Sequence, residues 1–271
     1  MQLVVTGACS VLGQALLRAI VARGSLSTSV GGPVPVQRII AVDRTQPARL
    51  YVEPRVEYVC GNFEQSRFLA RVMGTATDSI FHLAPLGAAA GIGGNLEDLD
   101  LALMRSLDTT RSLVDACQFQ SAQPRLVLAS AAAARHDPGA PPATVEGVCS
   151  ALCELFLLEC ARRGYVDLRG VRLPCVVGDG SSDEGKALDL ALAGLAAQPL
   201  PTVGQAPDTV IAVVTATEAA AALLDAHERP GAVAGLAPMT ELAGRKRPLA
   251  ELLDAPPPAQ GLGPASNAAL P

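Results

Sequence analysis

The sequence predicts an α/β protein built on a doubly wound parallel sheet, with a small C-terminal region beside it. Two observations carry this prediction. Short, nearly continuous apolar runs alternate with longer segments that carry apolar residues at helical spacing. The apolar runs are typical of strands that are buried on both faces, which is the environment of a parallel sheet covered by helices.

The elements follow one another in a regular order. The expected strands are the apolar runs at 2–6, 38–43, 55–60, 79–84, 124–130 and 167–174. The expected helices between them span 11–23, 64–72, 96–119 and 145–163. The segment 24–37 is rich in Gly, Ser and Pro, and we expect it to be a loop. This alternation predicts a sheet of the Rossmann type over residues 1–175.

The pattern loosens after Pro174. Residues 176–253 are expected to form a small region on the substrate side, with a helix near 186–197, a strand at 209–214 and a helix at 217–227. Arg245, Lys246 and Arg247 are expected to lie in a loop. From residue 254 to 271 the chain is Pro, Ala and Gly with almost no charge, which predicts an irregular tail.

Composition excludes several classes of protein. Apolar residues make up 49% of the chain, which is too many for a disordered protein. The net charge of −5, without a basic aromatic-rich stretch, argues against nucleic-acid binding. The uncharged runs 2–17 and 79–96 are interrupted by glycines and polar residues, so neither is expected to be a signal segment or a membrane span. Seven cysteines without a secretory signal indicate free thiols in the cytoplasm.

The turn after the first strand reads TGACSVLG. Gly7 and Gly13 occupy the outer positions of a GxxGxxG pattern, and Ser10 replaces the middle glycine. Such a turn lets the backbone approach a pyrophosphate at a helix N-terminus. Asp43 ends the second strand, where a carboxylate binds ribose hydroxyls and favours NAD over NADP; Arg44 beside it weakens that preference. The alternative is a sheet that binds no cofactor, because Ser10 adds a side chain at a crowded point.

The order of elements resembles the extended short-chain dehydrogenase/reductase family, the NAD-dependent epimerases and dehydratases, over residues 1–235. The resemblance rests on TGACSVLGQALLRAI, IIAVDR, GNF, FHLAP, DTTRSLVDAC, RLVLAS and RGVRLP. The stretch ARRGYVDLRGVRLP is most similar to the branch that contains D-erythronate dehydrogenase. The resemblance implies NAD as cofactor, although binding is expected to be weak or lost if Ser10 obstructs it.

The resemblance also implies a set of cofactor-binding residues. Asn62 replaces the usual Asp that faces the adenine amino group, and its amide oxygen still accepts a hydrogen bond. The implied set is Gly7, Ser10, Val11, Leu12, Gly13, Asp43, Arg44, Asn62, Phe63, Leu83, Ala84, Pro85 and Ser106.

The proton-transfer residues of the family are missing. Members use a Ser, and a Tyr with a Lys four residues later on the same helix face. The chain has three Tyr and two Lys, and no Tyr is followed by Lys at that spacing. Ala131 stands at the Ser position, just after Ser130. Glu146 and Ser150 stand at the Tyr and Lys positions, and Ser106 replaces a supporting Asn.

Three functions follow as hypotheses. The leading one is a non-catalytic member, a pseudoenzyme, that acts as a binding, sensing or partner subunit. The alternative is an active NAD-dependent oxidoreductase or epimerase-like enzyme on a small sugar acid or hydroxy acid. In such an enzyme Glu146 would take the proton-transfer role of the Tyr, which requires burial to raise its pKa. The alternative interpretation of Glu146 is a solvated residue near a helix start. The third is a structural relic without cofactor.

Other candidate residues carry weaker expectations. Cys149, Cys153 and Cys160 lie on one side of the 145–163 helix, and we expect them to pack in a core or interface rather than to bind metal. His82 is expected to be structural, and His136 with Arg135 is a minor candidate for ligand contact. The small apolar residues of the 145–163 helix favour a homodimer, as the resemblance implies. A protein partner of unknown identity is a further expectation.

Overall fold

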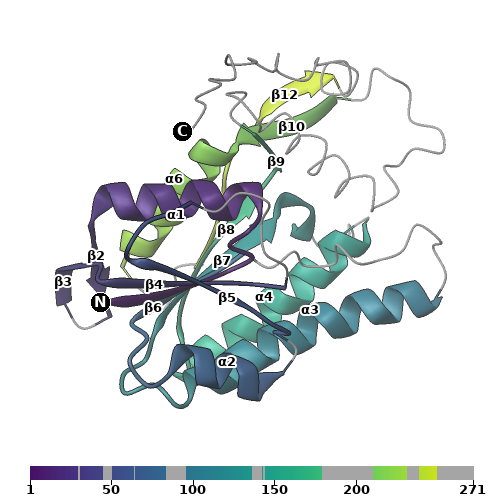
Figure 1. Ribbon diagram of the computed structural model, residues 1–271. Coiled ribbons are helices and arrows are strands. Elements are labelled where there is room, and N and C mark those ends of the chain that lie inside the picture. The colour runs from purple at the N-terminus through teal and green to yellow at the C-terminus, as the bar shows by residue number, and fades with distance from the viewer. Residues whose placement is uncertain are drawn as a thin grey trace, which may run out of the picture.

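The computed structural model (Figure 1) describes residues 1–29, 31–44, 51–63, 65–83, 96–135, 142, 144–178, 210–230 and 238–248. Several expectations fall outside these ranges. They are Ala84 and Pro85 of the implied cofactor site, His136, the helix expected at 186–197 and the tail from 254 to 271.

A parallel sheet of seven strands forms the centre of the molecule, in the order β11-β8-β7-β6-β1-β4-β5. All six of its pairings are parallel, which confirms the predicted α/β architecture. The sheet strands are β1 (Gln2–Thr6), β4 (Arg38–Asp43), β5 (Val56–Cys60), β6 (Ser79–His82), β7 (Arg125–Ala131), β8 (Asp167–Leu173) and β11 (Met239–Glu241).

Helices cover both faces of the sheet (Figure 1). One face carries α1 (Val11–Arg23) and α6 (Ala216–Glu228), and the other carries α2 (Ser66–Met73), α3 (Leu96–Cys117) and α4 (Val145–Arg162). A short 3-10 turn, η1 (Ala132–Ala134), follows β7. Within the described residues, none of the helices combines the length and the apolar character that crossing a membrane requires.

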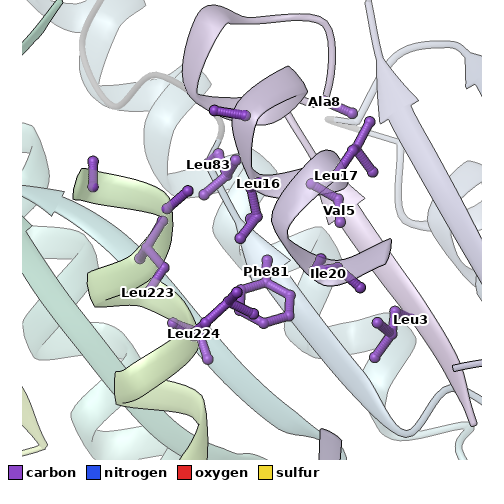
Figure 2. Close-up of a cluster of buried hydrophobic side chains, with 14 of the residues drawn as sticks. Leu3, Val5, Ala8, Leu16, Leu17, Ile20, Phe81, Leu83, Leu223 and Leu224 are labelled. Atoms are coloured by element: carbon purple, nitrogen blue, oxygen red, sulfur yellow. The ribbon is translucent and has the colours of Figure 1, made fainter. Parts of the chain in front are cut away.

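Each face has its own apolar core. Figure 2 shows the core under α1 and α6, where Leu16 and Ile20 meet Phe81 of β6 and Leu223 of α6. The core on the other face is built from strand residues such as Ile80 and Leu126 against α2, α3 and α4. Alternate residues of β6 therefore serve opposite cores, as expected for a strand that is buried on both sides.

The segment 24–37 is not the loop that the sequence predicts. It contains a hairpin of β2 (Ser25–Thr28) and β3 (Gly31–Pro35). All five residues of β3 are exposed, so the segment lacks the alternation of apolar and polar residues that identifies a strand. The hairpin is tied to α6 by Ser27, whose Oγ donates to Glu228 Oε2 at 2.6 Å.

The C-terminal region also departs from the prediction. Arg245, Lys246 and Arg247 lie in β12 (Arg245–Pro248) rather than in a loop. This strand pairs antiparallel with β10 (Val210–Thr215), which pairs parallel with β9 (Cys175–Val177). The strand was not predictable from the sequence pattern, because its three basic side chains are all exposed and its pairing partner is more than thirty residues away.

Two buried histidines make the stability of the fold depend on pH. Burial lowers the pKa of His82 to about 4. Burial also lowers the pKa of His227 to about 4, although Glu228 opposes the shift. His227 stacks on Phe81 with ring centroids 5.4 Å apart, and its Nε2 hydrogen-bonds Ser79 Oγ at 2.8 Å. Both rings are therefore neutral in the folded protein near pH 7.

We expect the protein to lose stability as the pH falls from about 6.5 toward 4. In that window the unfolded chain binds a proton at each histidine and the folded chain does not, so acid favours unfolding. The loss at pH 5 is about 2 kcal/mol for each histidine. Urea unfolding at pH 7, 6 and 5 measures it. His227→Gln keeps a donor for Ser79 and should reduce the pH dependence by half; an unchanged dependence in that variant contradicts the prediction.

Candidate dinucleotide and active site

The glycine-containing turn after β1 forms a close junction with α1. Gly7 has φ of 69°, a left-handed conformation that suits glycine. A Cβ on Gly13 would lie 2.5 Å from Gly7 O and 2.6 Å from Ala8 O, so only glycine fits there. Both positions have a backbone reason for glycine, and together they bring the start of α1 against the end of β1.

Ser10, the departure from the glycine pattern, fits this turn without strain. Its backbone is extended, with φ of −69° and ψ of 163°, so glycine is not required. Its Oγ donates to Gly7 O at 2.7 Å and accepts from Gly13 N at 3.0 Å. The side chain therefore turns inward as the N-cap of α1. The backbone amides of Val11 and Leu12 belong to the first helical turn, where an α-helix provides no internal acceptor.

Asp43 lies beside this turn at the carboxyl end of β4. Its Oδ2 accepts the backbone N–H of Cys9 at 2.7 Å, and its Oδ1 accepts the N–H of Arg44 at 2.7 Å. Each oxygen of a carboxylate accepts more than one hydrogen bond, so capacity remains for ribose hydroxyls. Position and charge make Asp43 suitable for the adenosine ribose of a dinucleotide.

Asn62, Phe63 and Leu83 of the implied cofactor set lie along the same edge of the sheet, whereas Ser106 lies within α3. Asn62 is exposed and Phe63 is buried just after β5, and the Arg44 guanidinium lies 6.0 Å from the Phe63 ring centre. Leu83 follows β6, and its amide bonds to Thr6 O at 3.1 Å. Because carboxyl ends of parallel strands meet at one edge, the fold gathers segments that are far apart in sequence.

His82 supports this edge from inside the fold. Its Nδ1 lies 2.7 Å from Thr6 Oγ1 on the neighbouring strand. Its Nε2 is buried and has no hydrogen-bond partner among the described residues. His82 thereby links the ends of β1 and β6, which fits the structural role expected from the sequence.

Gln14 is a supporting residue that the sequence analysis missed. Its Nε2 donates to Ala8 O in the glycine turn at 2.8 Å and to Tyr58 Oη at 3.2 Å. Its Oε1 accepts the N–H of Tyr51 at 3.2 Å. Gln14 thus joins the turn, α1 and β5. The sequence places Gln14 one helical turn after Ser10, which indicates that it lies near the glycine turn. Its partners Tyr51 and Tyr58 could not be predicted, because they come from a distant part of the chain.

The catalytic positions implied by the family lie on β7 and α4. Ala131 ends β7, and Glu146 and Ser150 occupy the first two turns of α4. Thr144 caps the helix by accepting the Gly147 N–H at 3.0 Å. A Cβ on Gly147 would collide with Ala133 O, so α4 begins in close contact with η1. The Ala131 side chain carries no polar atom, so it provides no hydrogen bond to a substrate oxygen.

Glu146 is half-buried at the start of α4, near two thiols. Burial raises the pKa of Cys175 to about 11, and the Glu146 charge adds to this effect. Burial also raises the pKa of Cys149, and a hydrogen bond with Ser106 of α3 partly offsets this increase. Ser150 is buried, and its Oγ has no hydrogen-bond partner within the described structure. Glu146 therefore lies close enough to Cys149 and Cys175 for its charge to act on both thiols.

A buried ion pair holds α4 against the sheet directly below these positions. Glu154 is 3% exposed, and Arg172 of β8 donates to its two oxygens through Nε at 3.0 Å and Nη2 at 2.6 Å. Ser130 donates to Glu154 Oε1 at 2.5 Å. Ser130, the only hydroxyl next to the Ala131 position, is therefore engaged with this pair. The ion pair could not be predicted from the sequence, because its two residues come from different elements.

Comparison with known proteins supports the family and the fold. No family model matches the chain. The chain is 30% identical to D-erythronate dehydrogenase of Cupriavidus necator over 269 residues, which cover 94% of this chain and 81% of the relative. A relative of this identity and coverage shows shared family membership.

Solved structures agree on the fold. The nucleoside-diphosphate-sugar epimerase of Agrobacterium tumefaciens superimposes with a TM-score of 0.64 at 24% identity, covering 93% of this chain and 76% of the other. The UDP-glucose 4-epimerase of Thermus thermophilus, solved in complex with NAD, gives 0.63 at 19% identity, covering 93% and 81%. The chain therefore belongs to the extended short-chain dehydrogenase/reductase family, the NAD-dependent epimerases and dehydratases, in the group that contains D-erythronate dehydrogenase.

Proposed function

We propose that this protein binds NAD(H) at the carboxyl edge of the sheet and oxidises a small hydroxy acid of the sugar-acid class. The observation that carries the proposal is the turn at Gly7, Ser10 and Gly13, which brings the first turn of α1, a type of site that binds pyrophosphates, against the end of β1. The name of the Cupriavidus necator relative supports the substrate class.

In this proposal the dinucleotide lies across the sheet edge. The amides of Val11 and Leu12 face the pyrophosphate, and Asp43 binds the adenosine ribose. The Asp43 carboxylate repels a 2′-phosphate, which favours NAD over NADP. Asn62 and Phe63 flank the adenine, while Leu83 and Ser106 lie toward the nicotinamide end.

Glu146 is assigned the proton-transfer role. When bound, the nicotinamide ring accepts a hydride from the carbon that bears the substrate hydroxyl. The Glu146 carboxylate takes the hydroxyl proton as the carbonyl forms, and solvent then receives it. Glu146 lies half-buried at the start of α4, the helix on which the family carries its proton-transfer residue. Ser150 leaves the position of the family's Lys without a charge.

The second candidate is a non-catalytic dinucleotide-binding protein. The replacement of three family positions by Ala131, Glu146 and Ser150 favours it, because Ala131 has no polar side-chain atom and Ser130 is engaged with Glu154. Such a protein keeps the cofactor site and acts through a protein partner.

Two measurements separate these functions. Calorimetric titration with NAD⁺, NADH and NADPH tests the cofactor site. Absorbance at the NADH band then follows turnover of D-erythronate and related four-carbon hydroxy acids. The enzyme proposal expects turnover by the native protein and at least a hundredfold loss of kcat in Glu146→Gln. Micromolar NADH binding without turnover overturns it and supports the second candidate. The absence of any dinucleotide binding overturns both.

A reconstructed variant sharpens this comparison. Ala131→Ser, Glu146→Tyr and Ser150→Lys together restore the family's residue types in the native backbone. If the native protein is a non-catalytic binder, this triple variant should gain turnover while its NADH affinity stays within a few-fold. Turnover that is present only in the native protein supports Glu146 as the acid/base group.

Asp43→Asn is expected to weaken NADH binding about tenfold, because the charge-assisted bonds to ribose are lost while the shape is kept. The variant should also bind NADH and NADPH with more similar affinities, because the repulsion of the 2′-phosphate disappears. Asp225→Asn on α6 is the matched control, since its side chain is 71% exposed and remote from the turn. Equal NADH affinity in the native protein and in Asp43→Asn would contradict the assignment of Asp43 to the adenosine ribose.

A homodimer through α3 and α4 is part of the proposal. The two helices pack side by side (Figure 1) and expose Leu101, Met104, Leu152 and Leu155. Such an apolar face is costly in water, and a second copy covers it in a closed two-fold arrangement.

Light scattering after size-exclusion chromatography tests the dimer. The native protein should have twice the mass of one chain, and Leu155→Glu with Met104→Glu should have the mass of one chain. Phe119→Glu is the control, because Phe119 is 65% exposed but lies beyond the end of α3. A native protein that elutes as a single chain overturns this part of the proposal.

A further inference from the structure

Two thiols flank Asp43 at the adenosine end of the proposed cofactor site. Cys60 ends β5 and is the register partner of Asp43 on β4. Neighbouring parallel strands lie about 4.8 Å apart, and aligned residues point to the same face of the sheet. Cys60 is exposed at this edge.

Cys9 reaches the same carboxylate from the opposite direction. It lies in the turn between β1 and α1, and its N–H donates to Asp43 Oδ2 at 2.7 Å. Burial raises the pKa of the Cys9 thiol to about 12, with further contributions from the charges of Asp43 and Cys60 and from a hydrogen bond between the thiol and Asp43. The two thiols are therefore close enough for each to feel the other's charge.

We propose that Cys9 and Cys60 form a reversible disulfide across Asp43 when a peroxide oxidises the protein, and that this modification closes the adenosine end of the dinucleotide site. The last clause rests on the proposed function; the disulfide itself does not. Cys9 belongs to a turn rather than to a strand, and its N–H is bonded to the Asp43 side chain rather than to the backbone of a strand.

The chemistry balances in two steps. The Cys60 thiolate attacks hydrogen peroxide, which yields a sulfenic acid at Cys60 and releases hydroxide. The Cys9 sulfur then attacks the Cys60 sulfur. Its proton passes to the Asp43 carboxylate and on to the departing hydroxyl, which leaves as water. Overall two thiols and one peroxide give one disulfide and two waters, and a dithiol reductant reverses the change.

The other cysteines are poorly placed for this reaction. Cys117, Cys149, Cys153 and Cys160 are buried and belong to α3 and α4, which cover the face of the sheet opposite α1. Cys175 is half-buried beside Glu146, at the far end of the proposed site. Exposure singles out Cys60 as the thiol that meets the oxidant first. Cys9 is the thiol placed to resolve it, because its backbone is bonded to Asp43, the register partner of Cys60.

Peptide mapping of the full-length protein tests the bond directly. Reduced protein is treated with hydrogen peroxide, its free thiols are alkylated, and trypsin is added. Cleavage after Arg18, Arg55 and Arg67 places Cys9 and Cys60 in separate peptides with one cysteine each. We expect a linked pair of residues 1–18 and 56–67, lighter by two hydrogens than the sum of the two peptides. Reduction or Cys60→Ser should abolish it, and Cys175→Ser should leave it unchanged.

Binding measurements test the consequence. NADH titrated into the reduced and oxidised protein should show at least a tenfold loss of affinity on oxidation, reversed by dithiothreitol and absent in Cys60→Ser. Recovery of Cys9 as an alkylated thiol after Cys60 has been oxidised overturns the proposal. A disulfide with unchanged NADH affinity overturns the closure of the site. If reduced protein binds no dinucleotide, the proposed function fails, and the mapping still decides whether the disulfide forms.

Discussion

Replacing Glu154 by alanine is expected to destabilise the protein by about 2–3 kcal/mol, less than for a fully buried ion pair because the Arg172 side chain is 23% exposed. Arg172 loses the carboxylate that accepts from its Nε and Nη2, and Ser130 loses its acceptor. Glu154 is 3% exposed, so water cannot replace it without a change in packing. Urea unfolding followed by circular dichroism measures the loss.

Two variants define the origin of that loss. Glu159→Ala removes the ion pairs with Arg162 and Arg163 on the exposed side of the same helix, and its unfolding midpoint should stay close to that of the native protein. Glu154→Leu with Arg172→Met replaces the charged pair by apolar groups and should recover much of the stability. A small effect of Glu154→Ala would mean that the pair does not hold α4 against the sheet.

Gly13→Ala is expected to reduce NADH affinity more than tenfold and to cost roughly 1–3 kcal/mol of stability, the usual cost of forcing extra atoms into a packed site. The new methyl group would lie 2.5 Å from Gly7 O and 2.6 Å from the Ala8 carbonyl. Helix α1 must therefore move away from the turn, and the Val11 and Leu12 amides move with it.

Gly32→Ala is the matched control for this change. Gly32 lies in the exposed strand β3, and a Cβ there meets nothing within 4 Å. Calorimetric titration and urea unfolding of both variants give the comparison. Native affinity and stability in Gly13→Ala would show that the turn adapts to a side chain at this position, against the tight junction described above.

The central sheet was predictable because its strands carry the pattern that burial on both faces imposes. Runs such as RIIAVD can avoid water only in a covered parallel sheet, and helical spacing marks the segments that cover it. The predicted helices agree with α1, α2, α3 and α4 to within about two residues at each end. The sequence also shows directly that no Tyr is followed by Lys four residues later.

Short strands were not predictable. The hairpin of β2 and β3 and the strands β9, β11 and β12 have three to five residues each. Each is too short to show a periodic pattern, and the partners of β9, β11 and β12 lie elsewhere in the chain; β11, for example, pairs with Gly170, Val171 and Arg172 of β8. A strand of this length gains its stability from the neighbour that pairs with it, so its own residues carry little signal.

The sequence by itself determined the parallel sheet and the glycine turn with its acidic neighbour, because these depend on local pattern and spacing. Only the tertiary structure decided that Ser10 turns inward as a helix cap and that Glu154 pairs with Arg172. The tertiary structure also decided that Cys9 and Cys60 lie on the two sides of Asp43. Each of these contacts depends on which elements the fold brings together. Its free energy comes from segments that are distant along the chain, so no local pattern reveals it.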